Sequence, residues 1–425
     1  MGLGVHGGGV GVARFLAEHG AQVTVTDLRP AEQLAASLDD LADLPITYVL
    51  GKHREADFRS AHLIVRNPAV PLNSPYLQAA SAAGVPIVME MTLFFQECPS
   101  PRIIGVTGTK GKTTTTLLLG ALLEAHGLPH VVAGNLRRSA LETLPRVTKE
   151  SWVVLELSSW QLEGLIPLQR SPHLAVITNI MPDHLDRYPS YDEYARSKGL
   201  IVRWQRPDDC AVLNKANPPV RALSRDTAGR IVWFDPTSDS PGWEAAHLYG
   251  AHNRANVAAA STAARVIGIP AGTIGRAVAA FPGVPHRLET VREFEGVRYI
   301  NDTTATTPEA MLAALGAVDR PTVLIAGGTD KGLDFSSLRA TVQGPRSTVT
   351  SVVLLKGTAT AKIAAACGPK VLGQPGDLEA ALGAASGAAE PGGVVLLSPG
   401  CASFGMFANE FDRGDRFRDL VRALT

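Results

Sequence analysis

From Ile103 to Ala125 the chain reads IIGVTGTKGKTTTTLLLGALLEA, an apolar β-branched run followed by a glycine-rich turn and a leucine-rich segment. This order predicts a strand, a tight turn and a helix. The first N–H groups and the dipole of such a helix favour an anion, so the turn has the form of a phosphate-binding loop. We predict that the backbone of residues 109–112 cradles phosphates, that Lys112 neutralises the terminal ones, and that the Thr113 hydroxyl binds Mg2+.

The loop departs by one residue from the common GxxxxGK spacing. Val106 stands where the first glycine is expected, and Gly105 precedes it. This offset separates the chain from generic phosphate-loop ATPases. A plain strand-to-helix turn is the other interpretation, and the Lys112–Thr113 pair in the correct context argues against it.

Short apolar runs alternate with Ala/Leu-rich helical segments along the whole chain. The runs predicted to be strands are AQVTVTD, HLIV, RIIGVTG, WVVLELS, LAVITN, CAVLN, TVLIAGG, SVVLLKG and GGVVLLS. Continuous apolar strands between helices indicate α/β domains with parallel sheets covered on both faces. We expect three such domains in series: a Rossmann-like N-terminal domain (1–99), a central P-loop ATPase domain (100–283) and a Rossmann-like C-terminal domain (284–425).

Composition narrows the functional class. The 40 basic and 40 acidic residues balance, which leaves no bulk field for gripping nucleic acid or anionic lipid. The four cysteines lack CxxC spacing, so neither a disulfide framework nor a zinc site is indicated. No apolar stretch has membrane-spanning length, and no signal core is present. We therefore expect a cytoplasmic protein without membrane or nucleic-acid partners, and take it to be a monomer.

The first residues have the pattern of a dinucleotide-binding unit. Gly2, Gly4 and Gly7 form GxGxxG, ARFLAEHG predicts a helix, and QVTVTD ends in Asp27. Such a loop normally follows a strand, and nothing precedes Met1 to form one. Our hypothesis is that the first strand lies upstream of this numbering. Because the glycines alone are weak evidence, a nucleotide-sugar site or a purely structural turn is preferred to NAD binding.

Further candidate residues lie at predicted strand ends beside the phosphate loop. WVVLELS carries Glu156, whose carboxylate can hold the nucleotide Mg2+. After LAVITN come His184 and Asp186, and Lys198 lies on the next helix. Each has a simpler explanation: a helix cap, an ion pair with Arg187 and a solvated charge, respectively. Together at one sheet edge they indicate a site.

The chain resembles the Mur ligases. The motifs occur in family order over essentially the whole chain: GVTGTKGKTT, ELSSWQLE, TNIMPDHLDRY, GAHNRANVAAA, PHRLE, INDTTATTPEA, GGTDKGLDF and LSPGCASFGMF. ELSSWQLE and SPGCASF favour the branch that adds D-glutamate over the folylpolyglutamate synthases, which share the ATPase core. The resemblance implies ATP-dependent joining of D-glutamate to UDP-N-acetylmuramoyl-L-alanine through an acyl phosphate, a step of peptidoglycan precursor synthesis.

The resemblance also implies roles for individual residues. Catalytic roles fall to Lys112, His184 and Lys198. ATP would contact Gly108, Thr109, Lys110, Gly111, Lys112, Thr113, Thr114, Asn253, Asn256, Arg287 and Asp302. The UDP-sugar would contact Gly4, Val5, His6, Asp27, Arg29, Asn135, Ser158, Ser159 and Gln161. The amino acid would contact Thr306, Lys331 and Ser403. Two Mg2+ ions would be held by Thr113, Glu156, His184 and a carbamylated Lys198. Carbamylation needs an unprotonated amine, so the surroundings should depress the pKa of that lysine.

Some positions depart from the family pattern. Thr304 stands where family members carry lysine, Glu410 stands at a usually aromatic position, and Arg137 and Arg138 add charge beside Asn135. The lost lysine removes a charge-assisted hydrogen bond to a dianionic amino acid, about 1.5 to 3 kcal/mol of binding. L-Glutamate or another amino acid therefore stays open as acceptor, as does a folylpolyglutamate synthase-like ligase. An idle nucleotide-binding module is disfavoured because the site residues are retained, and an NAD oxidoreductase because it gives the phosphate loop no role.

Overall fold

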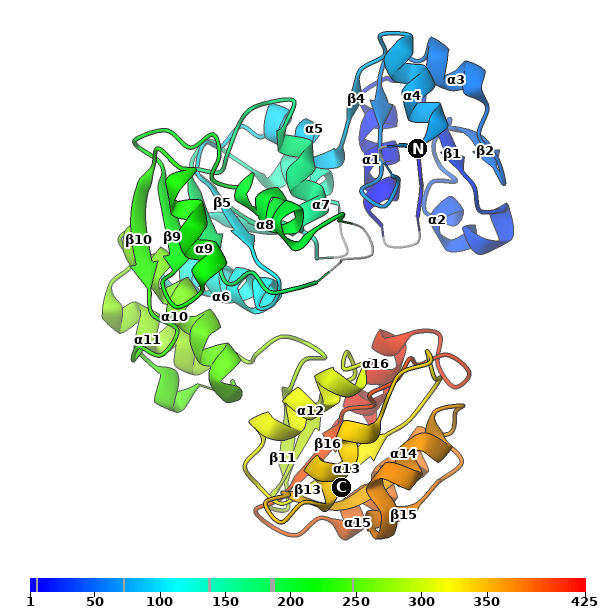
Figure 1. Cartoon of the computed structure of the whole chain (residues 1–425), viewed down its shortest axis with the longest axis vertical. Coiled ribbons are helices and arrows are strands. Elements are labelled where there is room, and N and C mark those ends of the chain that lie inside the picture. The colour runs from blue at the N-terminus through cyan, green and yellow to red at the C-terminus, as the bar shows by residue number, and fades with distance from the viewer. Residues whose placement is uncertain (5–6, 72, 137–138, 184–187, 247) are drawn as a thin grey trace. The chain divides into compact units, whose positions relative to one another are not determined.

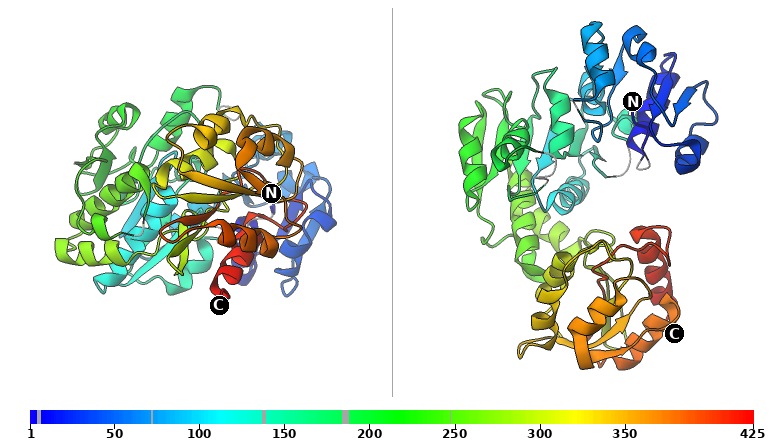
Figure 2. Two further views of the ribbon diagram at one scale, coloured as in Figure 1. Left: turned by 90° about the horizontal axis from the view of Figure 1, so that it is seen from below. Right: turned by 45° about the vertical axis from the view of Figure 1, so that its right-hand side comes forward.

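The computed structural model describes residues 1–4, 7–71, 73–136, 139–183, 188–246 and 248–425. They form two compact units: Met1–Trp243 with Ala255–Val278, and Glu244–Arg254 with Ala279–Thr425. In both units strands and helices alternate along the chain (Figures 1 and 2). The α/β class predicted from the sequence is confirmed. The two predicted boundaries between the three domains stay predictions.

The first 89 residues of the larger unit contain two small parallel sheets. Their strands are β1 (Thr24–Asp27) with β2 (Thr47–Leu50), and β3 (Ile64–Val65) with β4 (Ile87–Val88). Their helices are α1 (Gly8–Glu18), α2 (Ala35–Asp39), α3 (Glu55–Ser60) and α4 (Pro75–Ala82). Residues 1–4 form no strand, but Gly2 N–H donates to the Thr26 carbonyl at 2.8 Å and the Met1 ammonium donates to the Val65 carbonyl at 2.9 Å. They thus link β1 to β3, and whether a strand precedes them stays a prediction.

A parallel six-stranded sheet forms the rest of the larger unit, in the order β10-β9-β8-β5-β7-β6. The strands are β5 (Ile103–Thr107), β6 (His130–Gly134), β7 (Trp152–Glu156), β8 (Leu174–Ile177), β9 (Cys210–Asn214) and β10 (Arg230–Phe234). The helices are α5 (Glu90–Glu97), α6 (Lys112–Ala125), α7 (Ser159–Leu162), α8 (Tyr191–Gly199) and α9 (Pro218–Ala222), together with most of α10 (Gly250–Val266) and α11 (Ala271–Ala280), whose residues 250–254 and 279–280 belong to the smaller unit. After β5 the chain runs first to one side and then, from β8, to the other. The order therefore reverses at β5, and ligands of such sheets bind beyond the carboxyl ends of strands at this point.

The smaller unit holds a second six-stranded sheet, in the order β11-β12-β16-β13-β14-β15. Its strands are β11 (Glu289–Phe294), β12 (Val297–Asn301), β13 (Thr322–Ala326), β14 (Val349–Leu354), β15 (Val371–Gly373) and β16 (Val394–Leu397). Its helices are α12 (Pro308–Ala317), α13 (Ser336–Gln343), α14 (Thr360–Cys367), α15 (Leu378–Ala388) and α16 (Glu410–Arg422). All pairs are parallel except β11 with β12, which form an antiparallel hairpin at the edge.

Burial follows from this layering. Every residue of β5, β9 and β13 is buried, because helices cover both faces of the central strands. The edge strand β10 keeps most of its residues partly or fully exposed.

Short 3-10 helices cover Ala31–Gln33, Leu141–Arg146, Glu163–Leu165, Leu223–Arg225, Trp243–Ala245 and Gly368–Lys370. Within the described residues, no helix combines the length and apolar character that crossing a membrane requires.

Candidate active site

The turn between β5 and α6 is shaped as the sequence predicts for a phosphate loop. Gly108 and Gly111 adopt φ values of 152° and 85°, which L side chains rarely take. A Cβ at the first position would overlap the Thr178 hydroxyl, and a Cβ at the second would overlap the amide oxygen of Asn256 on α10. Both glycines are therefore required for close approach, and the N-terminus of α6 faces the carboxyl edge of the sheet.

The segment after β8 holds the loop in shape. Asn179 accepts the Lys110 N–H at 2.9 Å through its side chain and the Thr109 N–H at 2.8 Å through its carbonyl. The Thr109 hydroxyl lies 3.1 Å from the Tyr194 hydroxyl on α8. Lys112 folds back, and its ammonium donates to the carbonyls of Gly108 and Thr109, each at 3.0 Å.

Lys198 on α8 reaches the same loop. Only 2% of it is exposed, and its ammonium donates to the Gly108 carbonyl at 2.9 Å, the carbonyl that Lys112 also contacts. Burial, followed by repulsion from Lys112, lowers the pKa of Lys198 to about 7. The depressed pKa expected for this lysine is confirmed, and the solvated alternative is wrong.

Glu156 ends β7 next to the loop strand, in register with Val106 of β5. It is 2% exposed, and its Oε1 accepts a hydrogen bond from the Asn135 amide at 3.0 Å. Its Oε2 is buried and has no hydrogen-bond partner among the described residues. An isolated carboxylate oxygen in such a place is unfavourable unless a cation joins it. With the half-buried Thr113 hydroxyl at the start of α6, this donor chemistry fits Mg2+.

Some predicted metal and sugar-nucleotide residues lie outside the part of the chain that the structure describes. They are His184, Asp186 beside it, Val5 and His6, and their predicted roles stay predictions. Among the residues that are described, no cluster of three His, Cys, Asp or Glu side chains is placed to hold a metal.

Most of the predicted sugar-nucleotide residues that are described form two local clusters, whereas Asn135 donates to Glu156. The Asp27 carboxylate accepts N–H groups from Gly4 at 3.2 Å and from Arg29 at 2.9 Å, which draws the first glycine turn to the end of β1. Ser158 and Gln161 cap each other across the start of α7, with Ser159 buried between them. The described contacts of the second cluster are those of a capping box.

In the smaller unit, three predicted loops meet at the carboxyl ends of β12, β16 and β13. The N–H of Gly400 donates to the Ala305 carbonyl at 2.8 Å, and Thr329 forms an isolated bridge with Ala402. These contacts join the loops that carry the three residues predicted to bind the amino acid: Thr306, Lys331 and Ser403. Lys331 is exposed and Ser403 is buried.

The structure also describes the predicted ATP residues that lie outside the phosphate loop. Asp302 is 7% exposed and accepts hydrogen bonds from the Ser398 hydroxyl at 2.8 Å and from the Leu288 N–H at 3.1 Å. Burial raises its pKa to about 7. Arg287 is exposed in the turn before β11. Asn253 is buried on α10 and donates to the Tyr249 carbonyl at 2.9 Å.

Comparison with known proteins gives this geometry a family. Matching models are the Mur ligase MurD-like N-terminal domain at residues 1–89, the Mur ligase middle domain at 106–278 and the Mur ligase glutamate ligase domain at 286–401. The chain belongs to the Mur ligase family. A UDP-N-acetylmuramoylalanine–D-glutamate ligase of Roseiflexus sp. (strain RS-1) is 52% identical, with 100% of this chain and 98% of the relative covered. One of Symbiobacterium thermophilum is 37% identical, with 100% and 97% covered.

Solved Mur ligases share the fold. The UDP-N-acetylmuramate-alanine ligase MurC of Thermotoga maritima matches with a TM-score of 0.60 and 19% identity, over 99% of this chain and 98% of that one. The MurF ligase of the same organism, solved in complex with ADP, matches with a TM-score of 0.60 and 17% identity, over 96% and 98%. The predicted series of three Mur ligase domains is confirmed.

Two residues that hold the phosphate loop in shape were not predicted from the sequence. Asn179 and Tyr194 make the contacts that hold Thr109 and Lys110, yet neither was singled out. The signal was present for Asn179, because it lies two residues after the buried strand β8 at the carboxyl edge of the sheet. Tyr194 gave no such signal, since its neighbour across space is 85 residues away in sequence.

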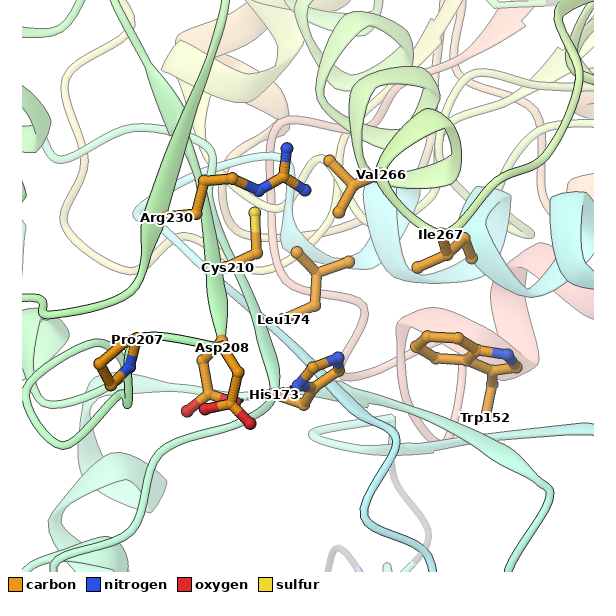
Figure 3. Close-up of a pocket in the computed structure, with 10 residues that line it drawn as sticks. Trp152, His173, Leu174, Pro207, Asp208, Cys210, Arg230, Val266 and Ile267 are labelled. Carbon is orange, nitrogen blue, oxygen red and sulfur yellow. Dashed lines mark hydrogen bonds and ion pairs between the residues drawn. The ribbon is translucent and has the colours of Figure 1, made fainter.

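A separate cavity of about 290 Å3 lies at the amino ends of strands in the six-stranded sheet of the larger unit (Figure 3). Trp152, Leu174, Cys210 and Arg230, which line it, are the first residues of their strands. The phosphate loop follows the last residue of β5, so this cavity is not the predicted site.

Proposed function

We propose that this Mur ligase joins D-glutamate to UDP-N-acetylmuramoyl-L-alanine, with ATP activating the alanine carboxylate as an acyl phosphate. The name of the 52% identical Roseiflexus relative, aligned over the whole chain, supports this assignment. The observation that carries the ATP-dependent activation step is the convergence of Lys112 and Lys198 on one phosphate-loop carbonyl, with the unpartnered oxygen of Glu156 at the end of the neighbouring strand.

The chemistry explains why these groups are needed. A carboxylate accepts an amine poorly, so its oxygen first attacks the terminal phosphorus of ATP and releases ADP. The glutamate amine then attacks the acyl carbon, loses a proton and expels phosphate. In the first step Lys112 leaves the loop carbonyls and neutralises the terminal phosphates, while the N–H groups of the loop hold them in line. Mg2+ held by Thr113 and Glu156 would neutralise further phosphate charge when bound.

We propose that Lys198 acts as a carbamate. Its neutral amine adds to CO2 and releases one proton, which converts a buried cation into an anionic oxygen donor for Mg2+. A pKa of about 7 supports this, because a large fraction of the amine is then unprotonated at neutral pH. Burial away from water supports it too, since the free ammonium is unfavourable there.

The acceptor is proposed as D-glutamate, with L-glutamate as the second candidate. The observation behind the second candidate is Thr304, whose hydroxyl donates to the His286 carbonyl at 2.9 Å and places no cation there. Lys331 remains the cation predicted to contact a carboxylate of the glutamate.

The test is phosphate release from ATP with UDP-N-acetylmuramoyl-L-alanine and a panel of amino acids. Stimulation that requires both this sugar nucleotide and D-glutamate is expected. No stimulation with any amino acid refutes the function, and stimulation by L-glutamate alone moves the acceptor. In the same assay Lys198→Ala should lose most turnover and regain part of it with a small added carboxylate, whereas the exposed Lys149→Ala control should behave like wild type.

A further inference from the structure

The turn that carries Arg287 has an unusual backbone. His286 and Leu288, on either side of it, have φ values of 67° and 45°, a left-handed conformation in which the Cβ of a non-glycine residue is crowded. Both flanking side chains are buried, whereas Arg287 is exposed. The turn therefore presents a single side chain outward, and something must hold its two flanks in a disfavoured conformation.

Two carboxylates hold those flanks. The N–H of His286 donates to Glu289 Oε2 at 2.8 Å, and the N–H of Leu288 donates to Asp302 Oδ1 at 3.1 Å. The carbonyl of His286 also accepts the Thr304 hydroxyl at 2.9 Å. The orientation of the turn thus depends on where the Glu289 carboxylate is fixed.

Arg418 on α16 fixes that carboxylate, together with the Asn301 amide, which donates to Oε2 at 3.1 Å. Its Nε donates to Glu289 Oε1 at 3.0 Å and one terminal nitrogen donates to Oε2 at 3.1 Å, a two-point contact between side chains that are 16% and 14% exposed. The other terminal nitrogen donates to Asp415 at 2.7 Å. Burial alone would raise the pKa of Glu289, but the hydrogen bonds from Arg418 and from the His286 N–H outweigh it, and the pKa is lowered. The carboxylate is therefore charged and fully committed to this arrangement.

We propose that Glu289 and Arg418 are positioning residues for Arg287. Arg418 locks the Glu289 carboxylate, the carboxylate locks the left-handed His286, and the turn then presents Arg287 in one orientation. This inference rests on the proposed function, in which Arg287 contacts the nucleotide. A fork-shaped guanidinium suits the role, because it fixes both carboxylate oxygens at once.

A purely structural ion pair is the competing explanation. It predicts that loss of Arg418 lowers the stability of α16 against β11 without a selective effect on the turn or on ATP. Arg416 provides a matched control, since it lies on the same helix and pairs with Asp412 at 2.8 Å away from the turn.

The experiment compares Arg418→Ala with Arg416→Ala in the full chain. Amide hydrogen exchange is measured by mass spectrometry for peptides covering 284–290, and for peptides of β12 and β16 as an internal reference. For Arg418→Ala we expect at least tenfold faster exchange in the turn only. This readout needs no catalytic activity.

Kinetics then connect the turn to the nucleotide. Arg418→Ala should raise the KM for ATP roughly tenfold with little change in kcat, and Arg418→Lys should recover part of the loss. In an Arg287→Ala background the same substitution should add almost nothing, because its effect passes through Arg287.

Three results overturn the inference. They are turn exchange equal to that of Arg416→Ala, faster exchange spread equally over β12 and β16, and multiplicative losses for Arg287→Ala and Arg418→Ala. A wild-type protein that turns over no ATP with any acceptor would refute the proposed function instead, and the exchange measurement would still decide whether Arg418 holds the turn.

Discussion

Replacing Asp302 by asparagine should stabilise the smaller unit above pH 7 and leave it nearly unchanged at pH 4. The carboxyl is 7% exposed, and burial raises its pKa from 3.8 to about 7, although hydrogen bonds from Ser398 and Leu288 and the charge of Arg287 oppose the shift. A shift of roughly three pKa units corresponds to about 4 kcal/mol at 1.36 kcal/mol per unit. Asparagine must rearrange the Ser398 hydrogen bond, a loss of about 1 kcal/mol, so the net gain at pH 8 is about 3 kcal/mol.

The sign follows from proton linkage. Between about pH 4 and pH 7 the folded protein keeps the Asp302 proton that the unfolded chain has already released, so the free energy of unfolding falls as pH rises through this window. Above pH 7 both states are ionised and the penalty is complete. The asparagine variant carries no such penalty, and its advantage should therefore appear across the window and then level off.

Buried cysteines allow the two units to be followed separately. Cys367 lies in the smaller unit and Cys98 and Cys210 lie in the larger one, and all are free and buried. Pulsed alkylation across a urea series, normalised at each pH to the unfolded chain, reports their exposure by mass spectrometry. Asp302→Asn should shift the Cys367 transition at pH 8 but not at pH 4.

The control for this measurement is Asp319→Asn, a substitution at an exposed carboxyl of the same unit. It should leave the Cys367 transition in place at every pH. An Asp302→Asn protein with the same stability as wild type at pH 8, or with a gain that is equal at pH 4, would refute the reasoning.

Other substitutions probe the site. Gly111→Ala should abolish ATP binding measured by calorimetry, because its Cβ would overlap Asn256. Gly127→Ala is the control, since Gly127 also has a positive φ but has open space around it, and this variant should bind ATP normally. Weak binding by both variants would show that backbone strain, and not the overlap, causes the loss. Glu156→Gln should raise the Mg2+ concentration needed for half-maximal turnover at least tenfold without lowering the thermal midpoint in EDTA, and a lower midpoint would mean that this carboxylate is structural. Thr304→Lys should lower the KM for the amino acid about tenfold, matching a charge-assisted hydrogen bond, and an unchanged KM would place the acceptor elsewhere.

The apolar runs identified most interior strands of the two large sheets but missed the edge strands and the interior strand β12. Every apolar run predicted to be a strand contains one, and most of these lie inside the two large sheets. The overlooked strands include β6, β10, β11 and β15, which are the outermost strands of those sheets. An edge strand is covered less completely. RIVWF mixes exposed and buried positions, ETVREF has no fully buried residue, and neither shows the continuous apolar signature.

The site was predictable where its residues follow a strand directly. The phosphate loop does so and Glu156 is the last residue of its strand, and Lys198 could be expected to lose its charge once a carbamate was implied. The ion pair proposed to position Arg287 could not be predicted from the sequence, because Glu289 and Arg418 are 129 residues apart and only the packing of α16 brings them together. Compartment, oligomeric state and the roles assigned to His184, Val5 and His6 stay predictions from the sequence.

The ammonium of Lys112 donates to carbonyls of its own loop, so a ligand that binds this ammonium must replace existing hydrogen bonds. With its own carbonyls as partners the lysine is already satisfied, and each of those bonds is worth about 1.5 to 3 kcal/mol. Adenosine offers no anionic oxygen that can replace these hydrogen bonds, whereas a triphosphate offers several acceptors for the same ammonium. Phosphate binding therefore exchanges bonds within the loop for bonds to the ligand.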